Sequence, residues 1–345
     1  MKKHQNIKKL FGMETLNMIT IITRITFFLL LLFLSNQSYA SSLGQRLFNT
    51  YQFDRAEKVL PELSSKGDAD ATFWLALVQF QNGKHFVAGD TMHKAAEQGN
   101  PWAMRMLVPK WNNYCDYLGW PCDSRWKQKA IDGWKILAKK NDGKAMYALL
   151  DVTYSIWKDI PFYRVYKYDK IVDKIVKNGG YNALNNRFVL SDSKRIELLK
   201  YAIKRNNPNA MVWIYYQCDD YGLKLSEGEN CNDWLNTALD MGYYKAAQAL
   251  RFYYSGFRGD KVVYKSIKPD EAFYYYSLGK LSGIDKFLFV FPSGKFSRNQ
   301  QRKLDEIQAK YMKVGISEKA KKFFKNHKPR TFYDESSDVN DILKP

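Results

Sequence analysis

Small and large apolar residues recur along this chain at a helical spacing. At six places a turn containing Gly or Asn leads into an alanine, and at five of them a large aliphatic residue follows four positions later. Residues four apart share one face of a helix, so each pair predicts a buried helical stripe. Arg187 stands at that place in the remaining unit. The alanines are Ala71, Ala103, Ala145, Ala183, Ala210 and Ala246, and the aliphatic residues are Leu75, Leu107, Leu149, Ile214 and Leu250.

This recurrence predicts a stacked repeat protein. The alanines return every 27 to 42 residues, which is the length of two helices with their loops. A second amphipathic helix precedes each turn, and a Gly or Asn at its end favours a left-handed cap. Each unit is therefore helix A, loop, helix B and turn, and Pro109 is expected to end or kink helix A of its own unit. The turns are marked by Gly67, Gly99, Gly143, Gly180, Asn206 with Asn207, and Gly242.

The local sequences of these units resemble the Sel-one-like repeat, a relative of the tetratricopeptide repeat. In that repeat, helix A carries Ala-x-x-x-Leu and helix B ends in Lys-Ala-Ala-x-x-Gly, as in residues 94–99 and in the stretch 254–275. The similarity spans roughly residues 46–290 and is weak between Tyr154 and Arg187. It implies an all-α, right-handed α/α superhelical solenoid of about six helix pairs over residues 41–290, followed by a C-terminal capping helix.

The first 40 residues predict export. Lysines at the start lead into an apolar run at 25–34 and a small-x-small site at Ser38-Tyr39-Ala40, which is the pattern of a secretory signal peptide cut after Ala40. Arg24 leaves the run short of the roughly 20 residues that a spanning helix needs, although an uncleaved anchor is the alternative. The start codon could be Met1, Met13 or Met18. We expect a periplasmic or secreted protein, and no cysteine near the cut marks it as a lipoprotein.

The four cysteines lie at equivalent places in two repeats. Each repeat has one near the end of helix A and one just before helix B, which favours pairing Cys115 with Cys122 and Cys218 with Cys231. Secreted cysteine-rich members of the family that this chain resembles carry such bridges across the A-to-B loop. Two other connectivities are possible on paper. A four-cysteine zinc site is the competing interpretation, but the spacings do not match its close pairs.

Charge suggests the kind of partner. The chain carries a net charge of +19, and loss of residues 1–40 would leave +15. A basic exported protein is suited to an acidic partner, an anionic membrane surface or a cell-wall polymer, and nucleic acid is not expected in that compartment. Residues 291–330 are expected to form basic helices, begun by Ser297 and Ser317, that either cap the repeats or bind an anion. Residues 331–345 are acidic, lack an apolar period and predict a disordered tail.

The sequence contains no recognisable catalytic signature. There is no Gly-x-Ser-x-Gly, Walker loop or His-Glu-x-x-His, so we expect neither enzyme activity nor a cofactor or metal. His85 and His93 could share a helix face, but Gly89-Asp90 between them suggests a loop-to-helix boundary. Adjacent tyrosines on a helix point about 100° apart, so one ring of each Tyr-Tyr pair is expected at an edge. These rings are either core with wet hydroxyls or a recognition surface.

Two classes of function remain. The first is a non-catalytic module whose helix A groove holds a protein, and the resemblance includes exported immunity proteins that neutralise lipase effectors of type VI secretion systems, as well as envelope adaptors. The alternative is a protein that binds or hydrolyses the cell wall, since cysteine-rich relatives have been linked to β-lactam binding. No activated nucleophile supports that alternative. Partner-binding residues are not indicated by the sequence.

Overall fold

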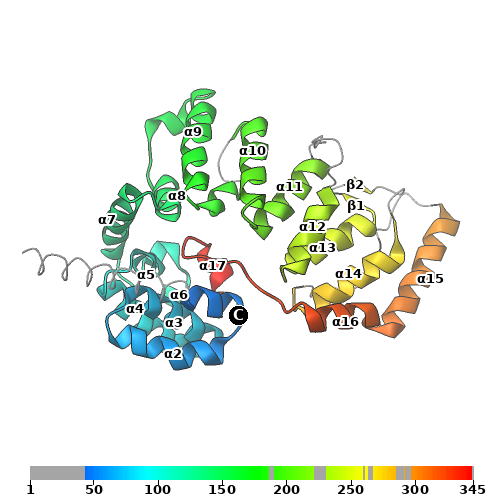
Figure 1. The fold of residues 1–345 in the computed structure, drawn as a ribbon, viewed down its shortest axis with the longest axis horizontal. Helices are drawn as coiled ribbons and strands as arrows, with labels where there is room; N and C mark the ends of the chain where they lie inside the picture. Colours follow the sequence, from blue (N-terminus) through cyan, green and yellow to red (C-terminus); the bar gives the residue numbers. More distant parts are fainter. Residues whose placement is uncertain are drawn as a thin grey trace, which may run out of the picture. The chain divides into compact units, whose positions relative to one another are not determined.

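The computed structural model describes residues 43–185, 190–220, 231–258, 261–262, 267–284, 291 and 297–343. The predicted signal peptide, residues 1–40, lies outside them. The described chain forms two compact units. The first contains the residues up to Asp123 except Asn49–Tyr51, and the second contains Asn49–Tyr51 and the residues from Ser124 onward. Both units consist of helices that pack against their neighbours in sequence, so the predicted all-α architecture of stacked helix pairs is confirmed (Figure 1).

The first unit contains α2 (Phe53–Ser65), α3 (Ala69–Gln81), α4 (His85–Glu97), α5 (Pro101–Met106), η1 (Pro109–Trp111) and α6 (Tyr114–Tyr117). Helix α3 packs against both α2 and α4, and all but one of the residues from Ala71 to Phe80 are buried. Helix α5 is short. It ends at Met106, and Pro109 opens a 3-10 turn, as the sequence predicts.

The second unit continues the alternation. Its elements are α7 (Trp126–Lys139), α8 (Gly143–Val152), η2 (Ile156–Asp159), α9 (Tyr163–Lys177), η3 (Tyr181–Leu184), α10 (Asp192–Ile203), α11 (Pro208–Asp220), α12 (Cys231–Asp240), α13 (Lys245–Tyr254), β1 (Phe257–Arg258), β2 (Lys261–Val262), α14 (Pro269–Leu281), α15 (Arg298–Val314), α16 (Glu318–Asn326) and α17 (Val339–Ile342). The two short strands pair antiparallel, with Phe257 opposite Val262. One apolar cluster runs from α8 to α14 and α16.

All six predicted turns have the same backbone geometry. In each, the residue four positions before the alanine has a left-handed φ, between 57° and 98°. The amide of the next residue donates to a carbonyl five positions back, which is the Schellman closure of a helix. The left-handed residues are Gly67, Gly99, Asn141, Gly179, Asn206 and Gly242. Gly and Asn tolerate this conformation best, which explains their recurrence.

The same turns also start the following helix. In four of them the residue after the left-handed one is Asp or Asn, and its side chain accepts a hydrogen bond from the amide of the alanine at 2.8 to 2.9 Å. These caps are Asp68, Asn100, Asp142 and Asn207. An acceptor there satisfies a helix amide that otherwise has no partner. Each of these four turns therefore closes helix B and opens helix A with two adjacent residues.

The predicted helical stripe is buried. All six alanines are at most 2% exposed, and four of the five aliphatic partners are buried with them. Leu149 is only half-buried, and its neighbour Leu150 takes the core position. Small residues at this place let consecutive helices approach closely.

Gly143 and Gly180 do not hold the left-handed positions of their turns. Those positions belong to Asn141 and Gly179. A Cβ on Gly180 would lie 2.3 Å from the carbonyl oxygen of Gly143, and one on Gly143 would lie 2.4 Å from that of Ile175. The two glycines are required by the close approach of neighbouring turns.

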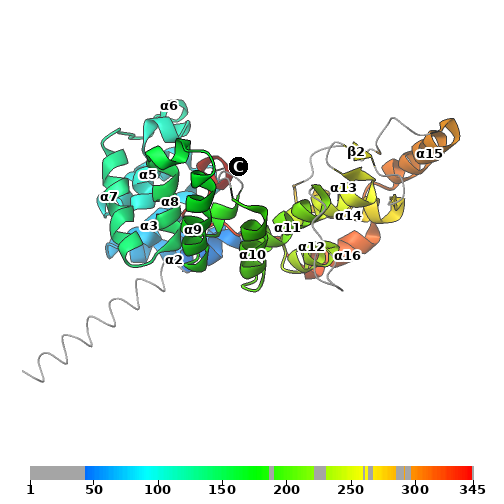
Figure 2. The same cartoon turned by 90° about the horizontal axis from the view of Figure 1, so that it is seen from above.

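The basic C-terminal helices cover the end of the array. Ser297 begins α15 with a capping box, in which its side chain accepts from the amide of Gln300. Ser317 precedes α16 but makes no side-chain cap; its amide donates to the hydroxyl of Ser277 on α14 at 3.1 Å. Helix α16 lies beside α14 in both views (Figures 1 and 2).

The acidic tail is structured, so the prediction of disorder was wrong for residues 331–343. Asp334 and Glu335 bond to Asn182 and Lys144 of the second unit, and the tail ends in α17, where Val339, Ile342 and Leu343 are at most 3% exposed. Composition misled because a few specific contacts order a segment that has no apolar period. We call residues 327–337 the C-terminal strap; Figure 1 draws it as the red segment between α16 and α17.

No helix among the residues that the structure describes is long and apolar enough to cross a membrane.

Candidate partner-binding site

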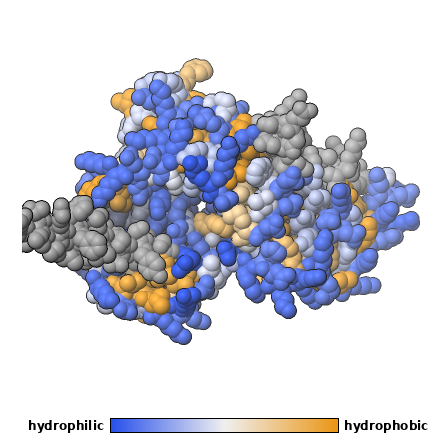
Figure 3. Space-filling view, viewed as in Figure 1, coloured by the Kyte–Doolittle hydropathy of each residue, from blue (hydrophilic) through white to orange (hydrophobic). Residues whose placement is uncertain are grey.

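Large apolar side chains gather at the surface where α8 passes into α9. Six of the fourteen exposed large hydrophobic residues of the described chain fall within residues 154–166. Phe162 is 90% exposed, and Tyr154 and Ile156 are 73% exposed. Hydrophobic atoms reach the surface over this part of the molecule in Figure 3. We call this set the aromatic ledge; it consists of Tyr154, Ile156, Ile160, Phe162, Tyr163 and Tyr166.

The segment that carries the ledge is held firmly from below. The ring of Trp157 packs edge-on against Tyr168 of α9, with centroids 4.9 Å apart. The Lys158 ammonium donates to the carbonyls of Leu150 and Thr153 at the end of α8, both at 2.6 Å. A cation there complements the negative end of the helix dipole. Burial lowers the pKa of Lys158. The exposed side chains therefore stand on an anchored base.

Phe162 adopts a strained backbone conformation. Its φ is 61° and its ψ is −49°, and the amide of Tyr163 donates to the carbonyl of Pro161 at 2.7 Å. This is the rare γ-turn with positive φ, which costs on the order of 1–3 kcal/mol for a residue other than Gly. The side chain gains no burial in return, since it projects into solvent. An exposed aromatic residue held at such a cost is typical of a binding surface.

Positive charge accompanies the rings of the ledge. Tyr163 and Tyr166 stack with centroids 6.3 Å apart on the first turn of α9. The Lys167 ammonium lies 5.4 Å from the ring of Tyr163, and that of Lys170 lies 4.4 Å from the ring of Tyr166. A hydrogen bond from Lys170, and then its charge, lowers the pKa of Tyr166. Aromatic area with ammonium groups on its border is suited to an anionic, partly apolar surface.

Sequence reasoning missed this ledge. It lies in the stretch from Tyr154 where the repeat pattern is weakest, and its apolar residues follow neither the helical nor the strand period. An aperiodic apolar run between two helices, flanked by lysines, was the signal that could have revealed it.

The structure joins the first predicted pair of cysteines. Cys115 and Cys122 form a disulfide with a Cα–Cα distance of 5.7 Å, across the loop between α6 and α7. Cys218 is also disulfide-bonded. The side chain of Cys231 lies outside the described part of the chain, so its pairing with Cys218 stays a prediction.

The disulfide loop holds a tryptophan against α4. Trp120, between the two cysteines, is 5% exposed, and its indole nitrogen donates to the carbonyl of His85 at 3.0 Å. A Cβ on Gly89 would lie only 2.6 Å from the Trp120 ring. The expected boundary at Gly89-Asp90 was therefore wrong: α4 runs unbroken through both residues, and Gly89 makes room for the indole.

His85 and His93 do not form a metal site together. His85 stacks on Phe80 with centroids 4.5 Å apart, and His93 lies 3.8 Å from the carboxylate of Glu97. Among the residues that the structure describes, no group of three or more His, Cys, Asp or Glu side chains could hold a metal ion.

The tyrosine runs at 243–244 and 274–276 are core. Both rings of the pair Tyr243-Tyr244 are buried, as are all three rings at 274–276, so the expectation that one ring of each pair lies at an edge was wrong for these runs. Helices α13 and α14 are both covered on more than one side, because α13 contacts α12 and α14, and α14 contacts α13 and α16. The hydroxyl of Tyr275 donates to Asn236 at 3.2 Å. Burial raises the pKa of Tyr274 to about 12.

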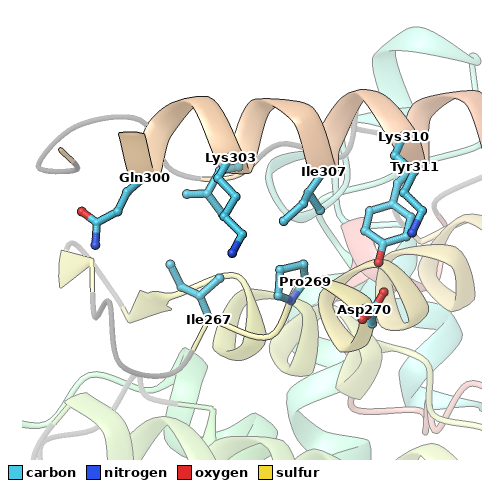
Figure 4. A pocket seen from close by; sticks show the side chains of 9 residues that line it. Ile267, Pro269, Asp270, Gln300, Lys303, Ile307, Lys310 and Tyr311 are labelled. Atoms are coloured by element: carbon cyan, nitrogen blue, oxygen red, sulfur yellow. The ribbon is translucent and has the colours of Figure 1, made fainter. Parts of the chain in front are cut away.

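A cavity of about 470 Å³ lies between α15 and the start of α14. Figure 4 shows Lys303 and Tyr311 reaching from α15 toward Pro269 and Asp270. Ile267, Leu304 and Ile307 complete an apolar floor; Gln300 and Lys310 also line the cavity. The lining combines the positive charges of Lys303 and Lys310 with the negative charge of Asp270, so its charges do not favour an anion clearly.

Comparison with known proteins gives structural neighbours but no relative in sequence. No protein-family model and no curated protein matches the chain. A protective antigen of uropathogenic Escherichia coli with an SLR fold matches 86% of this chain at 14% identity and a TM-score of 0.39; the match spans 65% of that protein, less than two thirds of its length. A Sel1 repeat protein from Oxalobacter formigenes matches 70% of this chain, over 99% of its own length, at 15% identity and a TM-score of 0.37. Both neighbours carry the repeat that the sequence resembles, and the helix-pair architecture itself rests on the described helices.

Proposed function

We propose that this protein is a non-catalytic repeat protein of the cell envelope that binds an acidic protein partner through the aromatic ledge. The observation that carries the proposal is the exposure of six large apolar side chains within thirteen residues, on a segment anchored by Trp157 and Lys158. Tyrosine is among the residues that dominate binding hot spots, and a rigid ledge loses little conformational entropy when it binds.

The charges favour an acidic partner. Between residues 154 and 170 the chain has four basic and two acidic side chains. Asp159 is engaged by the Tyr154 hydroxyl, and Asp169 by the amide and hydroxyl of Ser191. Lys167 and Lys170 flank the exposed rings and would steer an acidic surface toward them.

A stable complex needs more surface than the ledge alone. Standard interfaces bury about 800 Å² on each partner, which corresponds to 20 to 30 residues. The ledge would supply the central hot spot, and the neighbouring faces of the second unit would supply the rim.

The more specific form of the proposal is an immunity protein that neutralises a secreted lipase effector. Three features support it: the signal-like residues 1–40, the disulfide between Cys115 and Cys122, which persists in an oxidising compartment, and the net charge of +15 after residue 40. A protein of this kind must occlude an active site with a rigid surface, and the anchored ledge could form one.

The test is co-expression with the products of the genes adjacent to this one, followed by purification and a survival assay. We expect one acidic product to co-purify in defined stoichiometry, and the chain to protect cells that express it. Failure to bind any adjacent product, or binding without protection, would reject the immunity role. Binding that survives replacement of the ledge residues by serine would reject the ledge as the site.

A further inference from the structure

The C-terminal strap lies across the turns of the second unit in an extended conformation. Its backbone bonds to residues far away in sequence: the amide of Arg330 donates to the carbonyl of Gly242 at 2.9 Å, and the amide of Thr331 to that of Asn49 at 2.9 Å. The hydroxyl of Tyr244 donates to the carbonyl of His327 at 2.6 Å. The strap leaves no room at Gly242, where a Cβ would lie 2.4 Å from the carbonyl oxygen of Lys328.

One asparagine holds the strap backbone on both sides. The side-chain oxygen of Asn49 accepts from the amide of Tyr333 at 3.0 Å, and its nitrogen donates to the carbonyl of the same residue at 2.8 Å. This paired contact fixes the register of an extended chain without reading its side chains. Phe332 then packs edge-on against Tyr243, with centroids 5.6 Å apart.

The next three strap residues, Asp334 to Ser336, bond to polar side chains of two repeat turns. The Lys144 ammonium donates to Glu335 at 2.5 Å, and the side chain of Asn182 donates to Asp334 at 2.9 Å and to the hydroxyl of Ser336 at 2.8 Å. Glu335 is 4% exposed, so its charge is taken out of water. Lys144 and Asn182 belong to the turn segments that precede Ala145 and Ala183.

These contacts are a costly way to build a cap. A buried ion pair often contributes no more stability than well-packed apolar residues, but it does specify register. Burial, and then the charge of Glu335, raises the pKa of Asp334. Burial lowers the pKa of Lys144, but Glu335 and Asp334 outweigh that effect and leave the pKa raised. Asn49, Lys144, Asn182 and Tyr243, which we call the turn edge, thus bind an extended segment that has aromatic and acidic residues.

We propose that the turn edge formed by Asn49, Lys144, Asn182 and Tyr243 is a peptide-binding site that the C-terminal strap fills in cis. Its ligand in trans is an extended segment with an aromatic residue followed by a hydrogen-bond acceptor and then a carboxylate, and that segment displaces the strap. This site is separate from the aromatic ledge, and its test uses only the chain and its own C-terminal sequence. Failure of one proposal therefore leaves the other standing.

The experiment measures binding of a fluorescein-labelled peptide with the sequence of residues 327–343 to the full chain by polarisation. The chain is used as wild type and as Asp334→Ala with Glu335→Ala, which weakens the strap and leaves the receptor residues intact. We expect the peptide to bind the double variant at least tenfold more tightly than the wild type. Adding Lys144→Ala should remove that binding, and so should the same two alanines in the peptide.

No binding to a folded double variant, or binding that is indifferent to Lys144→Ala, would overturn the proposal. Hydrogen exchange of the wild-type protein keeps the test open if the variants do not fold. Strap amides such as those of Arg330 and Tyr333 should exchange at least tenfold faster than core amides of α13, because the strap opens by itself. Equal exchange rates would mean that the strap opens only when the unit unfolds, and the site would then be structural.

Discussion

Substituting Gly89 by alanine tests how the disulfide loop packs on α4. The substitution places a methyl group 2.6 Å from Cδ1 and 2.9 Å from Cγ of Trp120. Trp120 cannot easily retreat, because its indole bonds to the His85 carbonyl and because Cys115 and Cys122 tie the loop on either side. The added methyl group would therefore clash with an indole ring that is held in place.

Two effects of opposite sign decide the result. Alanine in a helix interior is favoured over glycine by about 1 kcal/mol. Overpacking a core costs typically 1 to 3 kcal/mol. The net expectation for Gly89→Ala is a loss of about 1 kcal/mol in the free energy of unfolding of the first unit. In the background of Trp120→Ala the indole ring is absent and the clash is removed. Gly89→Ala should then stabilise the protein by up to about 1 kcal/mol.

The assay is a double-mutant cycle in which urea unfolding is monitored by far-ultraviolet circular dichroism. This signal is chosen because it does not depend on the indole that Trp120→Ala removes. The expected coupling between positions 89 and 120 is about 2 kcal/mol, which exceeds the roughly 0.5 kcal/mol scatter of independent sites. If Gly89→Ala has the same effect in both backgrounds, Trp120 does not constrain α4, and the reasoning fails.

Three further predictions concern covalent and titratable groups. Replacing Cys115 and Cys122 by alanine should cost about 2.4 kcal/mol, as loop-closure entropy gives for a sequence separation of 7; non-reducing urea titrations check it, and no change would contradict it. The pKa of Asp334 is raised, so the contribution of this side chain to stability falls as the pH rises from about 4 through the folded pKa. Asp334→Asn should therefore be more stable than the wild type at pH 7 and lose that advantage near pH 4. Melting temperatures of both proteins across this pH range check the prediction. Burial raises the pKa of Tyr333 and of Tyr274 to about 12, so the contribution of these two side chains to stability is complete below about pH 10 and is lost toward pH 12. The tyrosinate absorbance of the folded protein should therefore show phenols that ionise well above pH 10. A single transition near pH 10 would contradict this.

The repeat could be read from the sequence because local chemistry determines it. A left-handed turn residue, an Asp or Asn cap and a buried alanine are each fixed within a few positions, so their recurrence announces the helix pairs. The same reading misplaced the left-handed residue at Gly143, because the requirement for glycine there comes from a neighbouring turn. Contacts between repeats are not encoded in local spacing.

The strap and the ledge escaped prediction for related reasons. The strap is ordered by partners such as Lys144 and Asn182, more than 150 residues away, and composition alone gives no sign of them. The ledge is recognisable only by exposure, since Phe162 and Ile156 look like core residues in the sequence. The tyrosine runs at 243–244 and 274–276 misled in the other direction, because helices covered on several sides bury adjacent rings.

Photo-crosslinking from the ledge tests the proposed function most directly. Phe162 is replaced by p-benzoylphenylalanine in the full chain, and Tyr117, which is 83% exposed on the first unit, is replaced in a matched control. We predict that position 162 crosslinks an acidic partner and that serine at Tyr163 and Tyr166 removes the adduct, while position 117 gives none. A partner that binds but crosslinks equally from both positions, or not at all from 162, would contradict recognition through the aromatic ledge.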